Sequence, residues 1–364
     1  MNPRIAVGSM SLIPLDLPMR QPFVTALGQK KITRNLLVAA RLSNGMTGYG
    51  EASASLAWPD DTQTAMTRVL QSVVSQLIGL PIRAYREGID LTWRTAGHHP
   101  TAAAALECAL VDAAARAQET CLWCWYGAKV RSISTGLTLS AWKASIAARA
   151  AESAARRGFR QFKIKVTGQD LEEDERRVLA VAQAAPKAAL LLDGNQGFSP
   201  SEAVRFVRGL DRRKIRVKLF EQPVARDNLE GLFKVQADGK IPVIADESVR
   251  NPNDLRHLLR KGKLYGVNIK VAKSGLIGAR EMTRMARAAG MKRMIGCMAE
   301  SAIGLTHSVA LACGTGAFDW IDLDSHLLVS SPDCQPGFTA RGPRLWVRKH
   351  RWGSGIELPI GRFG

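Results

Sequence analysis

Leu190-Leu191-Leu192-Asp193 is one of eight short apolar runs between residues 137 and 322 that end in a polar residue or a glycine. Val243-Ile244-Ala245-Asp246 and Val267-Asn268-Ile269-Lys270 have the same form, and residues with a helical pattern follow each of them. The closing residues lie 24 to 28 positions apart. Short buried strands that alternate with helices at a near-constant period are typical of parallel sheets, so the sequence predicts an α/β barrel. The runs close at Thr138, Lys165, Asp193, Glu221, Asp246, Lys270, Gly296 and Asp322.

The rest of the chain does not follow this period. Alternating apolar runs before the turn Ser43-Asn44-Gly45 predict an antiparallel meander, and helical patterns follow it. Residues 332–364 contain four Pro and six Gly and have no regular helical pattern. We therefore expect three parts: an α+β capping domain over residues 1–128, a modified TIM barrel of the (β/α)7β type over 129–331, and a tail over 332–364 that packs on the capping domain.

Composition excludes several classes of protein. With 364 residues, 46% of them hydrophobic, the chain can bury a large core. No apolar stretch is long enough for a secretion signal or a membrane span, so we expect a cytoplasmic protein without a membrane partner. The net charge of +19 raises the alternative of a nucleic-acid-binding barrel. Lys and Arg are spread over the predicted helices rather than gathered in one segment, which favours a solvated basic surface.

The chain has six cysteines, of which only Cys121 and Cys124 have the spacing of a metal or redox pair. A zinc site needs a second such pair or nearby histidines, and the sequence offers neither. We expect reduced, mostly buried thiols, and the role of the pair stays open.

Three acidic residues close consecutive strands of the predicted barrel. The carboxyl ends of barrel strands form the active-site mouth, so Asp193, Glu221 and Asp246 should lie side by side there. Asp193-Gly194-Asn195 alone is more often a turn than a ligand. Three oxygen ligands on neighbouring strands, however, predict a Mg²⁺ site.

Lysines flank this predicted site. Lys163 and Lys165 point to the same side of the second strand, toward the barrel interior unless they lie against the helices, which is costly for ammonium groups. Lys270 closes the sixth strand, so in a ring of eight it should face Lys165 across the mouth. A cation between them would lower a lysine pKa enough for it to act as a base and would stabilise an enediolate. The arrangement predicts proton removal from one face of a carbon and delivery to the other.

Five motifs together resemble the enolase superfamily, in its muconate-lactonizing enzyme subgroup, with a looser echo in residues 48–52. They are Phe162-Lys163-Ile164-Lys165, Asp193-Gly194-Asn195-Gln196-Gly197, Phe220-Glu221-Gln222-Pro223, Ala245-Asp246-Glu247-Ser248 and Val267-Asn268-Ile269-Lys270.

This resemblance implies a role for each residue of the predicted site. Asp193, Glu221 and Asp246 would hold one Mg²⁺ per subunit, with Asn195 and Lys273 supporting the ligands. Lys165 and Lys270 would be the acid/base pair, and Lys163 would tune Lys165 and meet the substrate carboxylate. A Lys base with Mg²⁺ on an enediolate is the known pattern of this superfamily.

The last predicted strand carries Asp322 and Asp324 on one side. This Asp-x-Asp pattern resembles the dipeptide epimerases, in which the pair binds the α-ammonium of the peptide, and Thr138 aligns with a substrate-contacting threonine of that group. The resemblance therefore implies a dipeptide substrate whose C-terminal residue is inverted. The alternative is that the two aspartates only cap the strand through local backbone bonds.

Side-chain specificity and the precise member of the superfamily stay open. When the chain is aligned on Pro22-Phe23, Gly28 stands where Ala-Glu epimerases carry an arginine, although Lys30 or Lys31 could substitute. The remaining alternatives are o-succinylbenzoate synthase, N-succinylamino acid racemase or a cycloisomerase, and a homo-oligomer is possible in each case. At the seventh strand we expect Cys297 and Met298 to shape the pocket for a less polar side chain, with Glu300 as a further polar contact.

Overall fold

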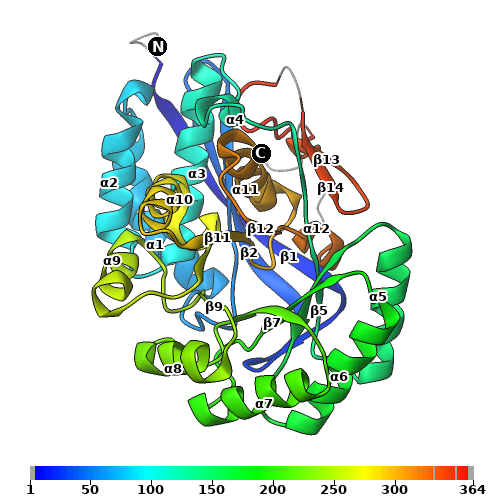
Figure 1. The fold of residues 1–364 in the computed structure, drawn as a ribbon. Helices are drawn as coiled ribbons and strands as arrows, with labels where there is room; N and C mark the ends of the chain where they lie inside the picture. The colour runs from blue at the N-terminus through cyan, green and yellow to red at the C-terminus, as the bar shows by residue number, and fades with distance from the viewer. Residues whose placement is uncertain (1–4, 331–332, 349–350, 360–364) are drawn as a thin grey trace.

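The computed structural model describes residues 5–330, 333–348 and 351–359 (Figure 1). Within them, eight parallel strands lie in one sheet in chain order and alternate with seven helices, which confirms the predicted (β/α)7β architecture. The strands are β5 (Leu137–Leu139), β6 (Gln161–Lys165), β7 (Ala189–Asp193), β8 (Val217–Glu221), β9 (Val243–Ala245), β10 (Gly266–Ile269), β11 (Lys292–Gly296) and β12 (Trp320–Asp322). The helices are α5 (Ala144–Arg156), α6 (Leu171–Ala184), α7 (Pro200–Arg212), α8 (Leu229–Gly239), α9 (Pro252–Lys261), α10 (Val271–Ala288) and α11 (Ala302–Thr315).

Side-chain alternation along the strands divides the core into two layers. Leu190 and Leu192 of β7 belong to the large cluster that includes the helices, whereas Leu191 lies in a small separate cluster. Leu191 has the same parity as Asp193, so it fills the barrel below the mouth while Asp193 lies above it. The other buried members of this interior cluster are Leu219, Ile244 and Met294.

The barrel is nearly closed, and its two edge strands are not joined by a ladder. Gly136 N–H beside β5 donates to Ile321 O of β12 at 3.0 Å, and Leu323 N–H donates to Thr135 Oγ1 at 2.7 Å. Both strands are only three residues long, which leaves few groups for regular pairing. Isolated bonds therefore complete the expected ring.

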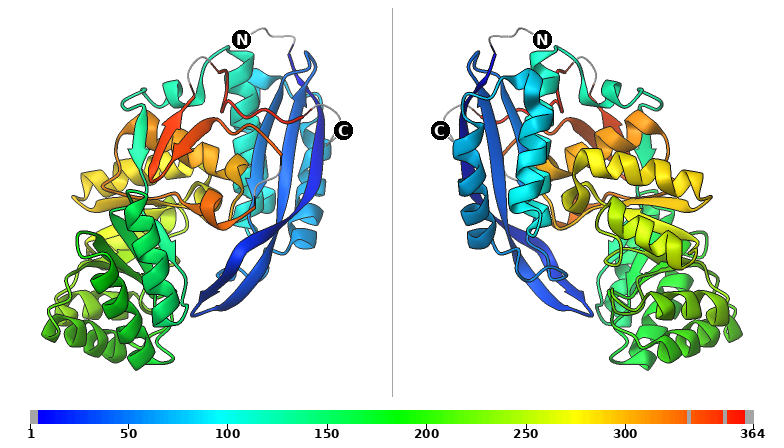
Figure 2. Two further views of the ribbon diagram at one scale, coloured as in Figure 1. Left: turned by 90° about the vertical axis from the view of Figure 1, so that its right-hand side faces the viewer. Right: turned by 90° about the vertical axis from the view of Figure 1, so that its left-hand side faces the viewer.

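The capping domain is an antiparallel sheet of β1 (Val7–Thr25), β2 (Gly28–Leu42) and β3 (Thr47–Ala52), with helices beside it. The separate runs expected before residue 28 form one long strand whose register is irregular between Pro18 and Phe23. Figure 2 shows the β1–β2 hairpin extending from this domain to the barrel. The helical elements are α1 (Gln63–Leu77), the 3₁₀ turn η1 (Ile82–Ala84), α2 (Tyr85–Ala96), α3 (Pro100–Ala117) and α4 (Leu122–Trp125). The sequence pattern did not indicate α2, whose buried face of Gly88, Ile89, Thr92 and Ala96 has only one large apolar residue.

The tail contacts both parts of the molecule. Strands β13 (Phe338–Arg341) and β14 (Arg344–Val347) form a sheet with β4 (Ser132–Ser134), and the short helix α12 (Ser325–Leu328) precedes them. Further along, Ser354 N–H donates to Asp112 of α3 at 2.6 Å, and Arg116 donates to Ile356 O at 2.7 Å. Residues 332, 349–350 and 360–364 of the predicted tail lie outside the described residues.

A disulfide joins Cys121 and Cys124, so the expectation of reduced thiols at this pair was wrong. Cys124 lies in α4, which begins directly after Cys121, and this turn brings the two Cα atoms to 5.2 Å, within the range that a disulfide spans. The cysteines Cys108, Cys297, Cys313 and Cys334 are free thiols. In the described residues, no helix is long and apolar enough to cross a membrane.

Candidate active site

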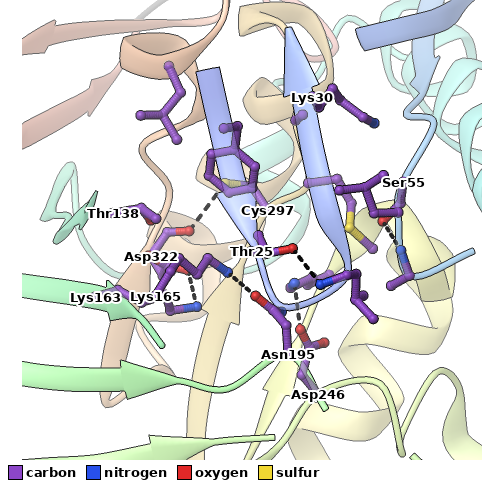
Figure 3. Close-up of a pocket in the computed structure, with 18 of the residues that line it drawn as sticks. Thr25, Lys30, Ser55, Thr138, Lys163, Lys165, Asn195, Asp246, Cys297 and Asp322 are labelled. Atoms are coloured by element: carbon purple, nitrogen blue, oxygen red, sulfur yellow. Dashed lines mark hydrogen bonds and ion pairs between the residues drawn. The ribbon is translucent and has the colours of Figure 1, made fainter. Parts of the chain in front are cut away.

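A pocket lies between the barrel mouth and the β1–β2 hairpin of the capping domain (Figure 3). Most of the predicted site residues line it, while Asp193, Glu221 and Lys273 are buried outside its lining. The predicted residues in its wall are Thr138, Lys163, Lys165, Asn195, Asp246, Lys270, Cys297, Met298, Asp322 and Asp324. One cavity thus brings together residues from strands that are far apart in the sequence.

Lys163 is the most heavily paired lysine of the site. It is 2% exposed, and its Nζ lies 2.6 Å from Glu221 Oε2, 2.5 Å from Asp322 Oδ2 and 3.7 Å from Asp193 Oδ2. Burial works to lower the pKa of Lys163, but the three carboxylates outweigh it and hold this pKa well above its usual value. Lys163 is therefore held as an ammonium group in the middle of the carboxylates.

Lys165 lies beside it on the same face of β6. Its Nζ donates to Asp193 Oδ2 at 2.6 Å and to Asn195 Oδ1 at 2.9 Å. Asn195 in turn donates through Nδ2 to Glu247 Oε1 at 3.2 Å. The ammonium of Lys165 also lies 5.6 Å from the ring centroid of Phe23, which belongs to the hairpin. The capping domain therefore covers this lysine directly.

On the opposite side of the ring, Asp246 forms ion pairs with two lysines. Lys270 Nζ donates to Asp246 Oδ2, and Lys273 Nζ donates to Asp246 Oδ1, each at 2.6 Å. Strands β10 and β6 are four apart in the sheet order, so Lys270 and Lys165 come from opposed sides of the barrel. A Cβ added to Gly296 would lie 3.0 Å from Lys270 Cε, so the glycine that closes β11 leaves room for this side chain.

Neighbouring charges decide the pKa of Lys270. Burial works to lower this pKa, and the charge of Lys163 adds to that effect, but Asp246, followed by Glu221, outweighs both and raises the pKa of Lys270 above its usual value. The same ion pair holds the pKa of Asp246 below its usual value, against the effect of burial. Burial raises the pKa of Glu221 to about 8, and Lys163 opposes this rise. The carboxylates thus keep Lys270 charged until something else neutralises them.

The donor set suits a magnesium ion. Asp193 and Glu221 are direct partners in the β7–β8 register, and Asp246 follows β9, the next strand, so three carboxylates share one arc of the mouth. In the described part of the chain, no three carboxylate, imidazole or thiolate groups meet as a coordination sphere. The carboxylate oxygens of Asp193, Glu221 and Asp246 are directed at the lysines instead. Magnesium binding at these residues therefore requires the ammonium groups to move aside.

Asp322, the last residue of β12, and Asp324, two residues further on, have different partners. Asp322 contacts Lys163, and its Oδ1 is buried without a hydrogen-bond partner. Asp324 Oδ2 accepts a hydrogen bond from Thr138 N–H at 2.5 Å. Burial, followed by the charge of Asp322, raises the pKa of Asp324 to about 7. Cys297 Sγ lies 3.3 Å from Asp322 O, so the free thiol packs against this pair.

The structure adds residues that the sequence-based site lacked. Asn268 donates to Glu221 Oε1 at 2.7 Å, and its position two residues before Lys270 could have indicated that it faces the barrel interior. Glu247 lines the pocket and has a buried, unpaired Oε2. Phe23 and Lys30 line it from the hairpin. Glu300 does not line the pocket; its carboxylate accepts a hydrogen bond from Met298 N–H at 2.8 Å.

The fold and site together define a class of protein: a capped β/α barrel with acidic residues and paired lysines at the strand ends. Two family models match the chain, "Enolase C-terminal domain-like" over residues 145–359 and "Mandelate racemase / muconate lactonizing enzyme, N-terminal domain" over residues 10–127. The chain therefore belongs to the enolase superfamily, in the mandelate racemase and muconate lactonizing enzyme group.

Individual relatives are similar over nearly the whole chain. An aromatic dipeptide epimerase of Herpetosiphon aurantiacus is 33% identical over 97% of this chain and 99% of its own length. An L-Ala-D/L-Glu epimerase of Thermotoga maritima is 35% identical over 90% of this chain and 94% of its own. The crystal structure of a dipeptide epimerase from Enterococcus faecalis, in complex with Mg and L-Leu-L-Tyr, superposes with a TM-score of 0.91 at 27% identity, covering 97% of this chain and 100% of that one.

Proposed function

We propose that this protein is a Mg²⁺-dependent dipeptide epimerase that inverts the α-carbon of the C-terminal residue of an L,L-dipeptide. One observation carries the proposal: Lys165 and Lys270 come from opposed strands and line one pocket, beside three carboxylates on the strands between them. The relatives named dipeptide epimerases, at 33% and 35% identity, support the reaction class. The Mg-containing complex of the Enterococcus faecalis enzyme supports the metal.

Asp193, Glu221 and Asp246 would hold one Mg²⁺ per subunit, with Asn195 and Lys273 bonded to the lysine or carboxylate beside them. When bound, the ion supplies positive charge that stabilises an enediolate. Its charge would also replace the lysines as the partner of the carboxylates. Lys165 and Lys270, released from Asp193 and Asp246, would then be free to exchange protons with a substrate carbon.

The two lysines would act on opposite faces of that carbon. One removes the α-proton as a neutral amine, and the other, as an ammonium group, delivers a proton to the other face. Exchange of the two roles gives the reverse reaction. Lys163 is held charged by its carboxylates, which suits binding of the substrate carboxylate rather than proton transfer.

Asp322 and Asp324 would bind the α-ammonium of the dipeptide. Both line the pocket, and the buried Oδ1 of Asp322 has no hydrogen-bond partner within the protein. An ammonium donor would satisfy it through a charge-assisted hydrogen bond. Thr138, Cys297 and Met298 complete this wall. An o-succinylbenzoate synthase, an N-succinylamino acid racemase or a cycloisomerase would use the same lysines, but none of their substrates presents an ammonium group to this pair.

The test is a screen of L,L-dipeptides with Mg²⁺ in D₂O, with deuterium gain read by mass spectrometry. We expect incorporation at the α-carbon of the C-terminal residue, accompanied by formation of the L,D product. Failure of every dipeptide, together with exchange in an N-succinylamino acid, would overturn the proposal. A cytoplasmic location, the oligomeric state and the absence of a nucleic-acid partner stay predictions from the sequence.

A further inference from the structure

A second groove lies where α10 of the barrel meets α2, α3 and α4 of the capping domain (Figure 1). Its volume is about 1370 Å³, and none of the described residues that line it lines the active-site pocket. The groove is thus large enough for a small-molecule ligand, whose sites usually occupy about 300 to 1,000 Å³. The proposed reaction does not use it.

One wall of this groove carries a row of arginines. Arg280, Arg284 and Arg287 lie four and three residues apart on α10, so they share one face of the helix, and Arg86 lines the groove from α2. All four side chains are exposed, and none forms an ion pair with a carboxylate of the described residues. Glu281 is the one acidic residue in the described lining, and it is paired with an arginine outside the groove. The positive charge of this wall is therefore not compensated within the described structure.

The spacing of these arginines opposes helix stability. On α5, Arg156 follows Glu152 by four residues and pairs with it at 2.8 Å. On α10, the residue four positions before Arg284 is another arginine, Arg280. Like charges at this spacing destabilise a helix, whereas opposite charges stabilise it. α10 therefore carries a repulsion that a bound anion would relieve.

Aromatic rings line the groove on the capping-domain side. The ring centroids of Tyr85 of α2 and Trp125 of α4 lie 6.2 Å apart, with 37° between the ring planes. Both side chains are partly exposed, so part of each ring is accessible to a ligand. The guanidinium carbon of Arg86 lies 5.8 Å from the centroid of the Tyr85 ring, which places cation and rings side by side. Such rings can stack against a planar base.

We propose that this groove binds a nucleoside triphosphate, with its phosphates on the arginines of α10 and its base against Tyr85 and Trp125. A guanidinium group matches phosphate oxygens with two parallel hydrogen bonds. Residues four apart on a helix stand about 5 to 6 Å from each other, so neighbouring arginines can contact one triphosphate chain together. The site is separate from the proposed epimerase reaction and adds a second ligand to the protein.

Other occupants fit the groove less well. An inorganic anion would use the arginines and leave the rings of Tyr85 and Trp125 without a partner. A second copy of this chain has the same net charge of +19 and would be repelled by the arginine row. A nucleoside triphosphate supplies both a ring and a concentrated negative charge in one small molecule.

Isothermal titration calorimetry of the Mg²⁺-loaded protein with ATP, inorganic triphosphate and adenosine tests the two parts of the site. We expect ATP to bind about tenfold more tightly than triphosphate, because stacking of the base adds to the phosphate contacts, and adenosine to bind more weakly than either. Arg280→Gln combined with Arg284→Gln should raise the Kd for ATP by about tenfold or more. Trp125→Leu should bring the Kd for ATP close to that for triphosphate. The matched control is Arg149→Gln combined with Arg205→Gln, which removes the same charge from exposed sites on α5 and α7 and should change the Kd little.

Several outcomes would overturn the proposal. Absence of ATP binding by the wild type would do so without any variant. Equal Kd values for ATP and triphosphate in the wild type would show that no base is recognised. An equal loss of ATP binding in the α5 and α7 control would show attraction to net charge alone. A single-stranded RNA that binds in the groove and is not displaced by ATP would assign the groove to nucleic acid instead. None of these results bears on the epimerase function, because the two cavities share no described residue.

Discussion

Two regions of this molecule hold their buried carboxylates by different means. At the barrel mouth, Asp193 and Asp246 are paired with lysine ammonium groups at 2.6 Å. At the contact between the capping domain and the barrel, Glu51 of β3 accepts hydrogen bonds from Ser301 N–H at 2.9 Å and from Gly304 N–H at 3.0 Å, with further bonds from the hydroxyl of Ser301 and from Asn35. Its carboxylate caps the first turn of α11.

This difference distinguishes carboxylates that can take part in the reaction from a carboxylate that stabilises the fold. A lysine side chain is long and flexible, and its ammonium group can move or exchange a proton, so the mouth can change its charge arrangement during a reaction. A backbone N–H can do neither, so the carboxylate that it holds is fixed. We therefore expect substitutions at the mouth to change the reaction. Loss of the Glu51 carboxylate should instead lower folding stability and leave the proton transfer unchanged.

The largest expected effect is the loss of a lysine from the mouth. Lys165→Ala or Lys270→Ala should lower kcat for epimerisation by about 10²- to 10⁴-fold, the range for a general acid or base. Each variant should still exchange the α-proton of one stereoisomer with deuterated solvent, because the other lysine remains. Proton NMR in D₂O measures both the epimerisation and the exchange of the α-proton. Lys292→Ala is the control, since Lys292 pairs with Asp319 away from the pocket. Normal turnover in both active-site variants would remove the lysines from the mechanism.

Next in size is the loss of a carboxylate that faces the substrate. Asp322→Asn and Asp324→Asn should each lower kcat/KM for dipeptides by about tenfold to a hundredfold, because a neutral amide replaces the ion pair with the α-ammonium. Steady-state kinetics with L-Ala-L-Glu and its N-acetyl derivative measure the effect. Acetylation removes the ammonium group, so the wild type should lose activity on the derivative while the variants lose little more. Intact dipeptide turnover in both variants would refute this role.

The sequence predicted the mouth well because its residues obey two local rules. The period of strands and helices located Asp193, Glu221 and Asp246, and the alternation within a strand placed Lys163 and Lys165 on one face. The same alternation could have identified Asn268, which bonds Glu221. Glu247 stood in a recognised motif without an assigned role, although it lines the pocket.

No local rule of this kind could predict the contact around Glu51 or the arrangement of the β1–β2 hairpin. Glu51 was visible only as part of a loose echo, and its partner Ser301 lies 250 positions away, so no local pattern joins them. The choice between Lys30 and Lys31 depends on the β1–β2 register, which places Lys30 opposite Phe23. A shift of one residue would reverse that choice. The disulfide at Cys121 depends likewise on where a short helix begins.

Removal of the Glu51 carboxylate should affect folding. Glu51→Ala leaves buried donors of α11 without an acceptor, so the free energy of unfolding should fall by about 3 to 5 kcal/mol. Urea unfolding followed by circular dichroism measures it. Glu172→Ala is a matched control because the side chain of Glu172 is 88% exposed, and its unfolding midpoint should barely move. At temperatures where the Glu51 variant stays folded, its kcat should remain within a few fold of the wild type; a stable variant without activity would contradict the division between the two regions.

Folding stability should also depend on pH through Glu107, at a second contact between the capping domain and the barrel. Glu107 of α3 is buried and accepts hydrogen bonds from Ile277 N–H of α10 at 2.7 Å and from Trp93 Nε1 at 2.6 Å. Burial raises its pKa from 4.5 to about 7, so the folded state holds this proton more tightly than the unfolded state. The resulting stability is fully present below about pH 4.5 and is lost as the pH rises through 7, by about 2 to 3 kcal/mol.

Glu107→Gln keeps this side chain neutral at every pH and therefore isolates its contribution. Other buried carboxyl groups titrate in the same range, but they are common to both proteins and cancel in the difference between them. The stability of the variant relative to the wild type should rise by about 2 to 3 kcal/mol between pH 4.5 and pH 8, measured by urea unfolding at each pH. A difference that stays constant over this range would mean that Glu107 does not change its charge on folding. Glu107 would then resemble the carboxylates of the mouth, whose lysine partners keep them ionised.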